Sequence, residues 1–115
     1  MNHDIIDLAV FAELQDSAGA DFVSELVDTF LEEAPGLLAM LRAAREAHDA
    51  DAFRRAAHSL KSNGQTFGAT ALGAAARQLE LAGLDADPAR DDAAIDGLQA
   101  AFGEAAKALK AISHG

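Results

Sequence analysis

The sequence predicts an all-α fold, an up-down antiparallel four-helix bundle with a short additional helix before it. Apolar residues recur at the three- and four-residue spacings of buried helix faces along most of the chain. Half of the residues are hydrophobic, Trp and Tyr are absent, and no alternating β-type run is present. The breaks between the apolar stretches are short, and short connections place consecutive helices antiparallel. With 115 residues, we expect residues 1–115 to form a single domain.

The short first helix begins after Asp7, whose side chain is expected to cap it. Its buried face consists of Leu8, Phe11 and Leu14. The helix ends before Gly19, because glycine suits the left-handed position that terminates many helices.

The second helix starts near residue 20 or 21 and extends to about residue 48. Its apolar stripe contains Val23, Leu26, Val27, Phe30, Ala34, Leu37, Leu38, Leu41 and Ala44. Pro35 lies inside this stripe, where a proline normally ends or kinks a helix. Because the apolar phase continues across it, we expect one long helix kinked near Pro35. The alternative is a new helix with Pro35 at its first position.

The third helix is capped by Asp49 or Asp51, should last to about Phe67, and is closed by Gly68. A fourth helix starts at Thr70, and its apolar stripe is Leu72, Ala75, Ala76, Leu79 and Gly83. Residues 84–88 then form a break, in which Asp87 caps the last helix and Pro88 takes its first position. The stripe of that helix is Ile95, Leu98, Phe102, Ala105, Leu109 and Ile112.

The third helix presents two different faces when its residues are placed at steps of about 100°. One face is apolar and fit for burial: Phe53, Ala56, Ala57, Leu60, Gly64 and Phe67. His58 points the opposite way, among Asp51, Arg54, Arg55, Lys61, Ser62 and Gln65. We therefore expect His58 on the solvent side, within side-chain reach of Arg54 and Lys61.

The same region stands out by its charge. The chain has 9 Lys+Arg and 19 Asp+Glu, a formal charge of −10. Residues 52–79 contain no acid but four cations, Arg54, Arg55, Lys61 and Arg77, so this window carries +4 and the remainder −14. An exposed imidazole on a positive surface favours an anionic group, and a nucleophilic His can carry a phosphoryl group covalently. A nearby Lys would then act as a point charge on the phosphoryl oxygens.

Residues 57–69 read Ala-His-Ser-Leu-Lys-Ser-x5-Gly-Ala. This string resembles the phosphoacceptor motif of the histidine-containing phosphotransfer (HPt) family of two-component phosphorelays, and the resemblance extends over most of the chain. It implies that His58 is the phosphoacceptor and that Lys61 steadies the phosphoryl group. Ser62 and Gly68 occupy small-residue positions that let a partner dock. The commonest family pattern has Gly directly after the Lys, where this chain has Ser62, and we expect slightly tighter access there.

The resemblance also implies phosphorylation at Nε2, so the other ring nitrogen needs a hydrogen-bond partner. Hairpin geometry about Gly68 places residues 78–80 opposite His58, which makes Gln78 and Glu80 the candidates. Family comparison favours Glu80, 22 residues after the His, although a plain solvated Glu is the alternative. Arg54 and Arg55 either add positive potential around His58, or meet the acidic pocket of a receiver domain, or simply belong to a solvated face.

Several function classes are excluded or disfavoured. Cys is absent, which excludes disulfides and Cys nucleophiles. No apolar run approaches the roughly 18 residues of a membrane span, and Met1–Asp4 lacks the basic region of a signal peptide, so we expect a cytoplasmic protein. The charge of −10 disfavours nucleic acid. No Glu-x-x-His motif is present and the four His are scattered, so we expect no metal site.

The leading hypothesis is a phosphorelay intermediate that accepts a phosphoryl group on His58 from a receiver-domain aspartyl phosphate and passes it to another response-regulator receiver. Its partners would be receiver domains and a hybrid sensor histidine kinase, docked over His58 and the short first helix. We expect a monomer, free-standing because of its initiating Met, with no ATP site or cofactor of its own and with Mg²⁺ supplied at the partner receiver. The alternatives are a non-phosphorylated helical-bundle adaptor that binds a receiver, and a metal- or haem-dependent enzyme, for which the ligands are missing.

Overall fold

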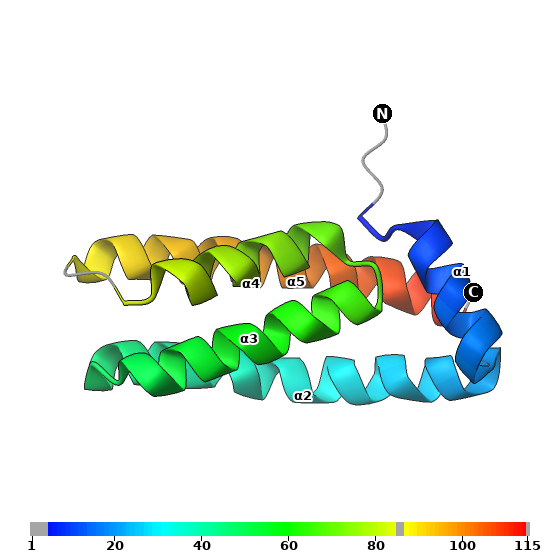
Figure 1. Ribbon diagram of the computed structural model, residues 1–115, viewed down its shortest axis with the longest axis horizontal. Helices are drawn as coiled ribbons and strands as arrows, with labels where there is room; N and C mark the ends of the chain where they lie inside the picture. Colours follow the sequence, from blue (N-terminus) through cyan, green and yellow to red (C-terminus); the bar gives the residue numbers. More distant parts are fainter. Residues whose placement is uncertain (1–4, 85–86, 115) are drawn as a thin grey trace.

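The structure is a computed structural model and describes residues 5–84 and 87–114. Within these ranges the chain forms five helices: α1 (Leu8–Ala18), α2 (Ala20–Ala47), α3 (Ala50–Thr66), α4 (Thr70–Ala82) and α5 (Pro88–His114) (Figure 1). An isolated antiparallel β-bridge joins Ile6 to Ala69, ahead of α1 and α4. The predicted all-helical class is confirmed. Of the predicted break at 84–88, residues 85 and 86 lie outside the described residues, as do residues 1–4.

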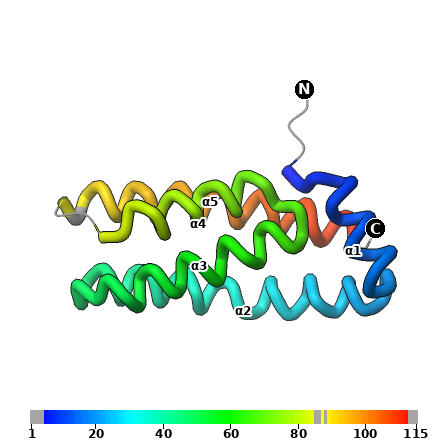
Figure 2. The backbone as a smooth tube through the Cα atoms, viewed as in Figure 1, coloured from blue at the N-terminus to red at the C-terminus, as the bar shows by residue number. Residues whose placement is uncertain are grey.

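The four longer helices lie lengthwise beside one another, and α1 crosses one end of them (Figure 1). Helix α2 contacts α3 and α5, and α4 contacts the same two helices from the other side. Consecutive helices from α2 to α5 run in opposite directions, as the colour course of the tube shows (Figure 2). Helix α1 contacts α2 and α3. Helix α3 therefore packs on both α2 and α4.

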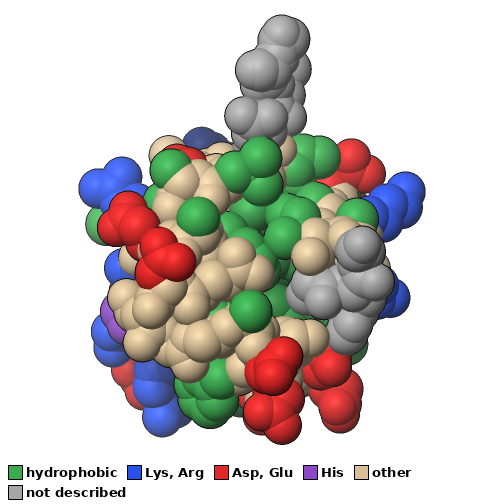
Figure 3. Space-filling view, turned by 90° about the vertical axis from the view of Figure 1, so that its right-hand side faces the viewer, with side chains coloured by type: hydrophobic (Ala, Val, Ile, Leu, Met, Phe, Trp, Pro, Cys, Tyr) green, Lys and Arg blue, Asp and Glu red, His purple; other side chains and the backbone are tan. Residues whose placement is uncertain are grey.

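The core consists of one cluster of buried apolar side chains to which all five helices contribute. Every residue of the stripes predicted for α2 to α5 is buried or half-buried, which confirms them. Aromatic rings join three helices at one level, because Phe30 packs on Phe67 at 5.4 Å and on Phe102 at 5.7 Å between ring centroids. Seen from the end that α1 crosses, hydrophobic side chains gather in the centre and charged ones around the rim (Figure 3).

The starts of α1, α3 and α5 follow from side-chain caps. The Asp7 carboxylate accepts hydrogen bonds from the backbone N–H groups of Ala9 and Val10. Asp49, rather than Asp51, caps α3, with its carboxylate 3.0 Å from the backbone nitrogen of Ala52. Asp87 caps α5 in the same way, and Pro88 is the first residue of that helix, as predicted.

Helix α2 continues without interruption from Ala20 to Ala47, with Pro35 inside it. The alternative in which Pro35 opens a separate helix is therefore wrong. The buried residues on both sides of the proline belong to one stripe, so a continuous helix buries all of them against α3 and α5. A kink at Pro35 stays a prediction.

The face predicted for α1 is wrong at one position, because the Leu8 side chain is 60% exposed. Helix α1 lies across the end of the other helices and contacts only α2 and α3 among them, so it buries a narrow strip. Phe11 is buried in this strip, and Leu14 is half-buried. Ile6, which precedes the helix, is buried instead of Leu8. Gly19 ends the helix with φ +94° and ψ 139°, a backbone conformation open to glycine but outside the left-handed helical region that was expected.

Two glycines allow close backbone approaches around the α3–α4 turn. Gly68 has φ +74°, and a Cβ there would lie 2.8 Å from the Asp7 carbonyl oxygen. The Asp7 N–H donates to the Gly68 carbonyl at 2.7 Å, which ties the start of α1 to this turn. A Cβ on Gly64 would lie 2.9 Å from the backbone nitrogen of Gly73, so α3 and α4 touch backbone to backbone there.

Candidate functional site

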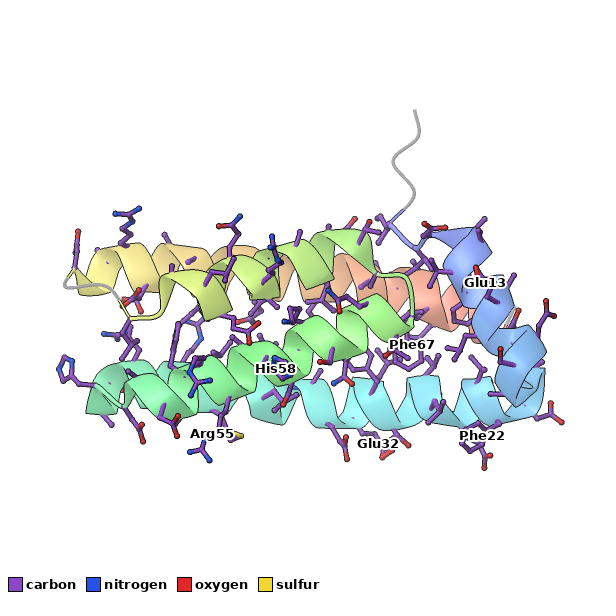
Figure 4. All side chains as sticks on the ribbon, viewed as in Figure 1. Glu13, Phe22, Glu32, Arg55, His58 and Phe67 are labelled. Carbon is purple, nitrogen blue, oxygen red and sulfur yellow. The ribbon has the colours of Figure 1, made fainter. Side chains whose placement is uncertain are left out.

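His58 lies on the solvent side of α3, as its helical position predicts. Its side chain is 57% exposed, whereas Ala57 and Leu60 beside it in the sequence are fully buried. The buried face of α3 packs against α2 and α4, which fixes the rotation of the helix and therefore the direction of His58 (Figure 4). A rigid helix thus presents this imidazole to water.

A carboxylate from the next helix joins His58 to Lys61. Glu80, on α4, has its Oε2 2.7 Å from Nδ1 of His58 and its Oε1 2.7 Å from Nζ of Lys61. The side chains of Lys61 and Glu80 are only 21% and 17% exposed. His58 and Lys61 are three residues apart on α3, so one carboxylate can contact both.

Glu80, rather than Gln78, contacts His58 because of the rotation of α4. Gly73 packs on the backbone of α3, and Glu80 follows it by seven residues, two helical turns, on the same face. Gln78 is exposed, and among the described residues it forms no hydrogen bond to His58. The rotation of α4 that the close Gly64–Gly73 contact fixes therefore separates the two candidates.

The Lys61 ammonium, and after it the His58 ring, hold the pKa of the Glu80 carboxyl below its usual value. Glu80 is therefore ionised at neutral pH and can only accept hydrogen bonds. The proton of the 2.7 Å contact must then reside on Nδ1 of His58, and we assign it there. In the neutral ring this leaves the lone pair on Nε2.

The positive surface predicted from the acid-free window is wrong in part, because the acids that border the window fold back onto its cations. Asp51 lies 2.7 Å from Arg54 and 3.1 Å from Arg55, and Glu80 binds Lys61. The spacings from Asp51, three and four residues, are those of helical ion pairs, so this pairing was visible in the sequence. Arg54 and Arg55 are thus exposed and paired with Asp51, and a role for them toward a receiver domain stays a prediction.

One side of His58 opens into a hollow of about 630 Å³ between α2 and α3. We call this hollow the α2–α3 groove; its lining residues are Glu32, Glu33, Gly36, Leu37, Met40, His58, Ser59, Ser62 and Asn63. Ser62, predicted to be near the docking surface, lies in it. Sequence analysis missed its acidic wall, because Glu32 and Glu33 belong to a different helix from His58 (Figure 4).

Two other predicted supporting residues lie elsewhere. Gln65 and Gly68 line a separate hollow of about 330 Å³ around the α3–α4 turn, together with Val10 and Arg77. Gly68 is buried against the start of α1, so its small size is required by the fold at that turn. In residues 5–84 and 87–114, no group of three His, Cys, Asp or Glu side chains is placed to hold a metal ion. No described helix has the length and apolar character to cross a bilayer.

Comparisons with known proteins agree with this geometry. A search of the curated proteins finds no match. The solved structure of histidine-containing phosphotransfer protein B (HptB) from Pseudomonas aeruginosa PAO1 superimposes with a TM-score of 0.82 and 28% sequence identity, covering 98% of this chain and 97% of that chain. The profile of the Hpt domain matches residues 25–113. The chain therefore belongs to the Hpt domain family, and its role is histidine phosphotransfer in a phosphorelay.

Proposed function

We propose that His58 accepts a phosphoryl group from the aspartyl phosphate of one receiver domain and passes it to the aspartate of another. The observation that carries this proposal is the exposed imidazole whose Nδ1 is held by Glu80 at 2.7 Å. With Nδ1 occupied, Nε2 is the ring nitrogen open to a partner.

In the accepting step, the Nε2 lone pair attacks phosphorus, and the bond between phosphorus and the aspartyl oxygen breaks with its electron pair on the carboxylate. Nδ1 keeps its proton, so the phosphorylated ring carries a formal positive charge. The ionised Glu80 carboxylate, hydrogen-bonded to that nitrogen, offsets this charge. The return step reverses these bond changes on a second receiver aspartate.

Lys61 supplies a second charge next to the reacting nitrogen. Its ammonium is held on Glu80 in the structure, one helical turn from His58. We propose that this ammonium also attracts the phosphoryl oxygens once they arrive, as a point charge that the three-residue spacing keeps in reach. Binding Glu80 and the phosphoryl group together would use two of its three N–H donors.

We propose that the rest of the chemistry belongs to the partners. The chain would need no cofactor of its own, since the receiver supplies Mg²⁺ and the acceptor aspartate. The frame would be an up-down four-helix bundle with α2 kinked near Pro35, supported by the contacts of α2 and α4 with both α3 and α5. The protein would act as a cytoplasmic monomer between a hybrid sensor histidine kinase and a response regulator.

The test is transfer from purified receiver domains that have been phosphorylated with acetyl phosphate. We expect the wild-type protein to acquire acid-labile, base-stable label, and His58→Gln to acquire none. His48→Gln is the matched control, because His48 is the exposed C-cap of α2 and should leave labelling unchanged. Binding of receivers without any label on the wild-type protein would contradict phosphotransfer and indicate an adaptor.

A further inference from the structure

The two sides of the His58 ring differ in the space that they leave for a partner. Toward α4, Glu80 and Lys61 already occupy the space beside the ring and are themselves mostly buried. Toward α2, the ring borders the open α2–α3 groove. A partner that reaches the ring therefore has room to insert side chains on the α2 side only.

The floor of the groove is apolar and adaptable. Leu37 is half-buried against the core, and Met40 next to it is 52% exposed. Both residues also line a smaller hollow of about 170 Å³ that continues along α2 and α3 past Ser59. Methionine side chains adjust to irregular partners, and exposed apolar groups beside a reactive residue mark interaction surfaces.

The end of the groove beside Ser62 and Asn63 is acidic, about two helical turns from His58. Glu32 and Glu33 line its α2 wall, and neither has an ion-pair partner among the described residues. A phosphorylated receiver brings negative charge to His58, which these two carboxylates repel. Docking is then favourable only when the partner places a cation over the α2 wall, and such charge complementarity fixes both orientation and choice of partner.

We propose that the α2–α3 groove selects the receiver domain that docks at His58. The selected receiver places an apolar side chain on Leu37 and Met40, and a Lys or Arg beside Glu32 and Glu33. This inference rests on the proposed function, and it makes Glu32 and Glu33 specificity-determining residues of the phosphotransfer reaction. Its basis is the continuity of the groove with His58 and the unpaired acidic charge on its α2 wall.

The charge is tested with two double variants of equal net charge. Glu32→Lys/Glu33→Lys reverses the groove wall, whereas Glu25→Lys/Glu46→Lys makes the same change at exposed α2 positions outside it. A panel of purified receiver domains is phosphorylated with acetyl phosphate. The probe is the receiver that transfers its phosphoryl group fastest to the wild-type protein. We expect the KM for this receiver to rise at least about tenfold in the groove variant and to stay within about twofold in the control. High salt should reduce the difference.

The apolar floor is tested with Met40→Asp against Phe22→Asp. Both side chains are 52% exposed on α2, but Phe22 lies near the end that α1 crosses, outside the groove. We expect Met40→Asp to raise the KM and Phe22→Asp to leave it unchanged. The reverse result would place the receiver over α1 and overturn the inference, as would equal KM values for the two charge variants.

A small phosphodonor separates this inference from the proposed function. Phosphoramidate needs no docking surface, so the two charge variants, Met40→Asp and Phe22→Asp should be labelled at the wild-type rate. If the wild type is labelled by phosphoramidate but by no receiver in the panel, the proposed transfer between receivers fails. If receivers label the wild type and the groove variant with the same KM, only the groove inference fails.

Discussion

Oε2 of Glu80 lies 2.7 Å from Nδ1 of His58, and this contact determines which nitrogen of the imidazole is free. The second oxygen of the same carboxylate binds Lys61, so the two residues of the family motif are joined through a third residue on another helix. Glu80 is thus a positioning residue, and the predictions begin with it.

Two substitutions of Glu80 should slow phosphotransfer to different extents. Glu80→Gln keeps an oxygen acceptor for Nδ1 but loses the ion pair with Lys61 and the charge that offsets the phosphorylated ring. Glu80→Ala loses the acceptor for Nδ1 as well as the ion pair and the charge. We expect Glu80→Ala to slow phosphotransfer by about tenfold or more, and Glu80→Gln to fall between it and the wild type. Rapid-quench transfer assays measure the rates, and Gln78→Ala is the control that should leave them unchanged.

The lowered pKa of Glu80 predicts how stability depends on pH. In the unfolded chain this carboxyl has the ordinary pKa of a Glu, 4.5, whereas in the folded protein its pKa is lower. Its contribution to folding is therefore fully present above the unfolded pKa and is lost as the pH falls through the folded pKa. Urea unfolding should show the wild type more stable than Glu80→Gln at pH 7, with a difference that shrinks on acidification below about pH 4. A difference that grew as the pH fell below about 4 would contradict the assignment.

Replacing Lys61 should reduce phosphotransfer less than replacing His58. In Lys61→Ala the phosphoryl oxygens lose an attracting charge, and the effect of a partly exposed charge is modest. We expect transfer to slow, or phosphohistidine hydrolysis to quicken, by up to about fivefold. Lys61→Arg keeps the charge and should recover most of the loss. Acid-quenched time courses of labelled protein measure both rates, and an unchanged rate in Lys61→Ala would remove Lys61 from the mechanism.

The α3–α4 contact predicts a stability difference between two glycines. Gly64→Ala places a Cβ 2.9 Å from the Gly73 backbone nitrogen, so the helices must separate, at a cost of about 1–3 kcal/mol. Gly97→Ala meets nothing within 4 Å and should stabilise its helix by about 0.5–1 kcal/mol. Denaturant unfolding compares the two. A neutral Gly64→Ala would show that the two backbones are not in close contact.

The helical frame was predictable because α2 to α5 carry continuous apolar stripes and because α1, α3 and α5 begin with a side-chain cap. Asp7, Asp49 and Asp87 cap helices through hydrogen bonds to residues two or three positions on, and such contacts depend on sequence alone. The exposure of Leu8 was not predictable in this way, because it depends on how α1 crosses the other helices.

The exposure of His58 could be predicted from the periodicity of α3 alone, whereas the residues around it come from α2, α3 and α4. Helical periodicity placed His58 outside, but Glu80 is distinguished from Gln78 only by the rotation that the Gly64–Gly73 contact imposes on α4. Glu32 comes 26 residues before His58, on a helix whose offset from α3 is set by core packing. No local pattern in the sequence joins these two residues.

The most direct test of the account locates the phosphoryl group on the ring of His58. NMR of protein labelled with ¹⁵N at histidine, recorded after transfer from a charged receiver, distinguishes the two ring nitrogens. Because Glu80 holds Nδ1 through its proton, we predict a phosphorus–nitrogen bond at Nε2 of His58 and a retained Nδ1–H. A phosphoryl group on Nδ1, or on any residue other than His58, would contradict the account.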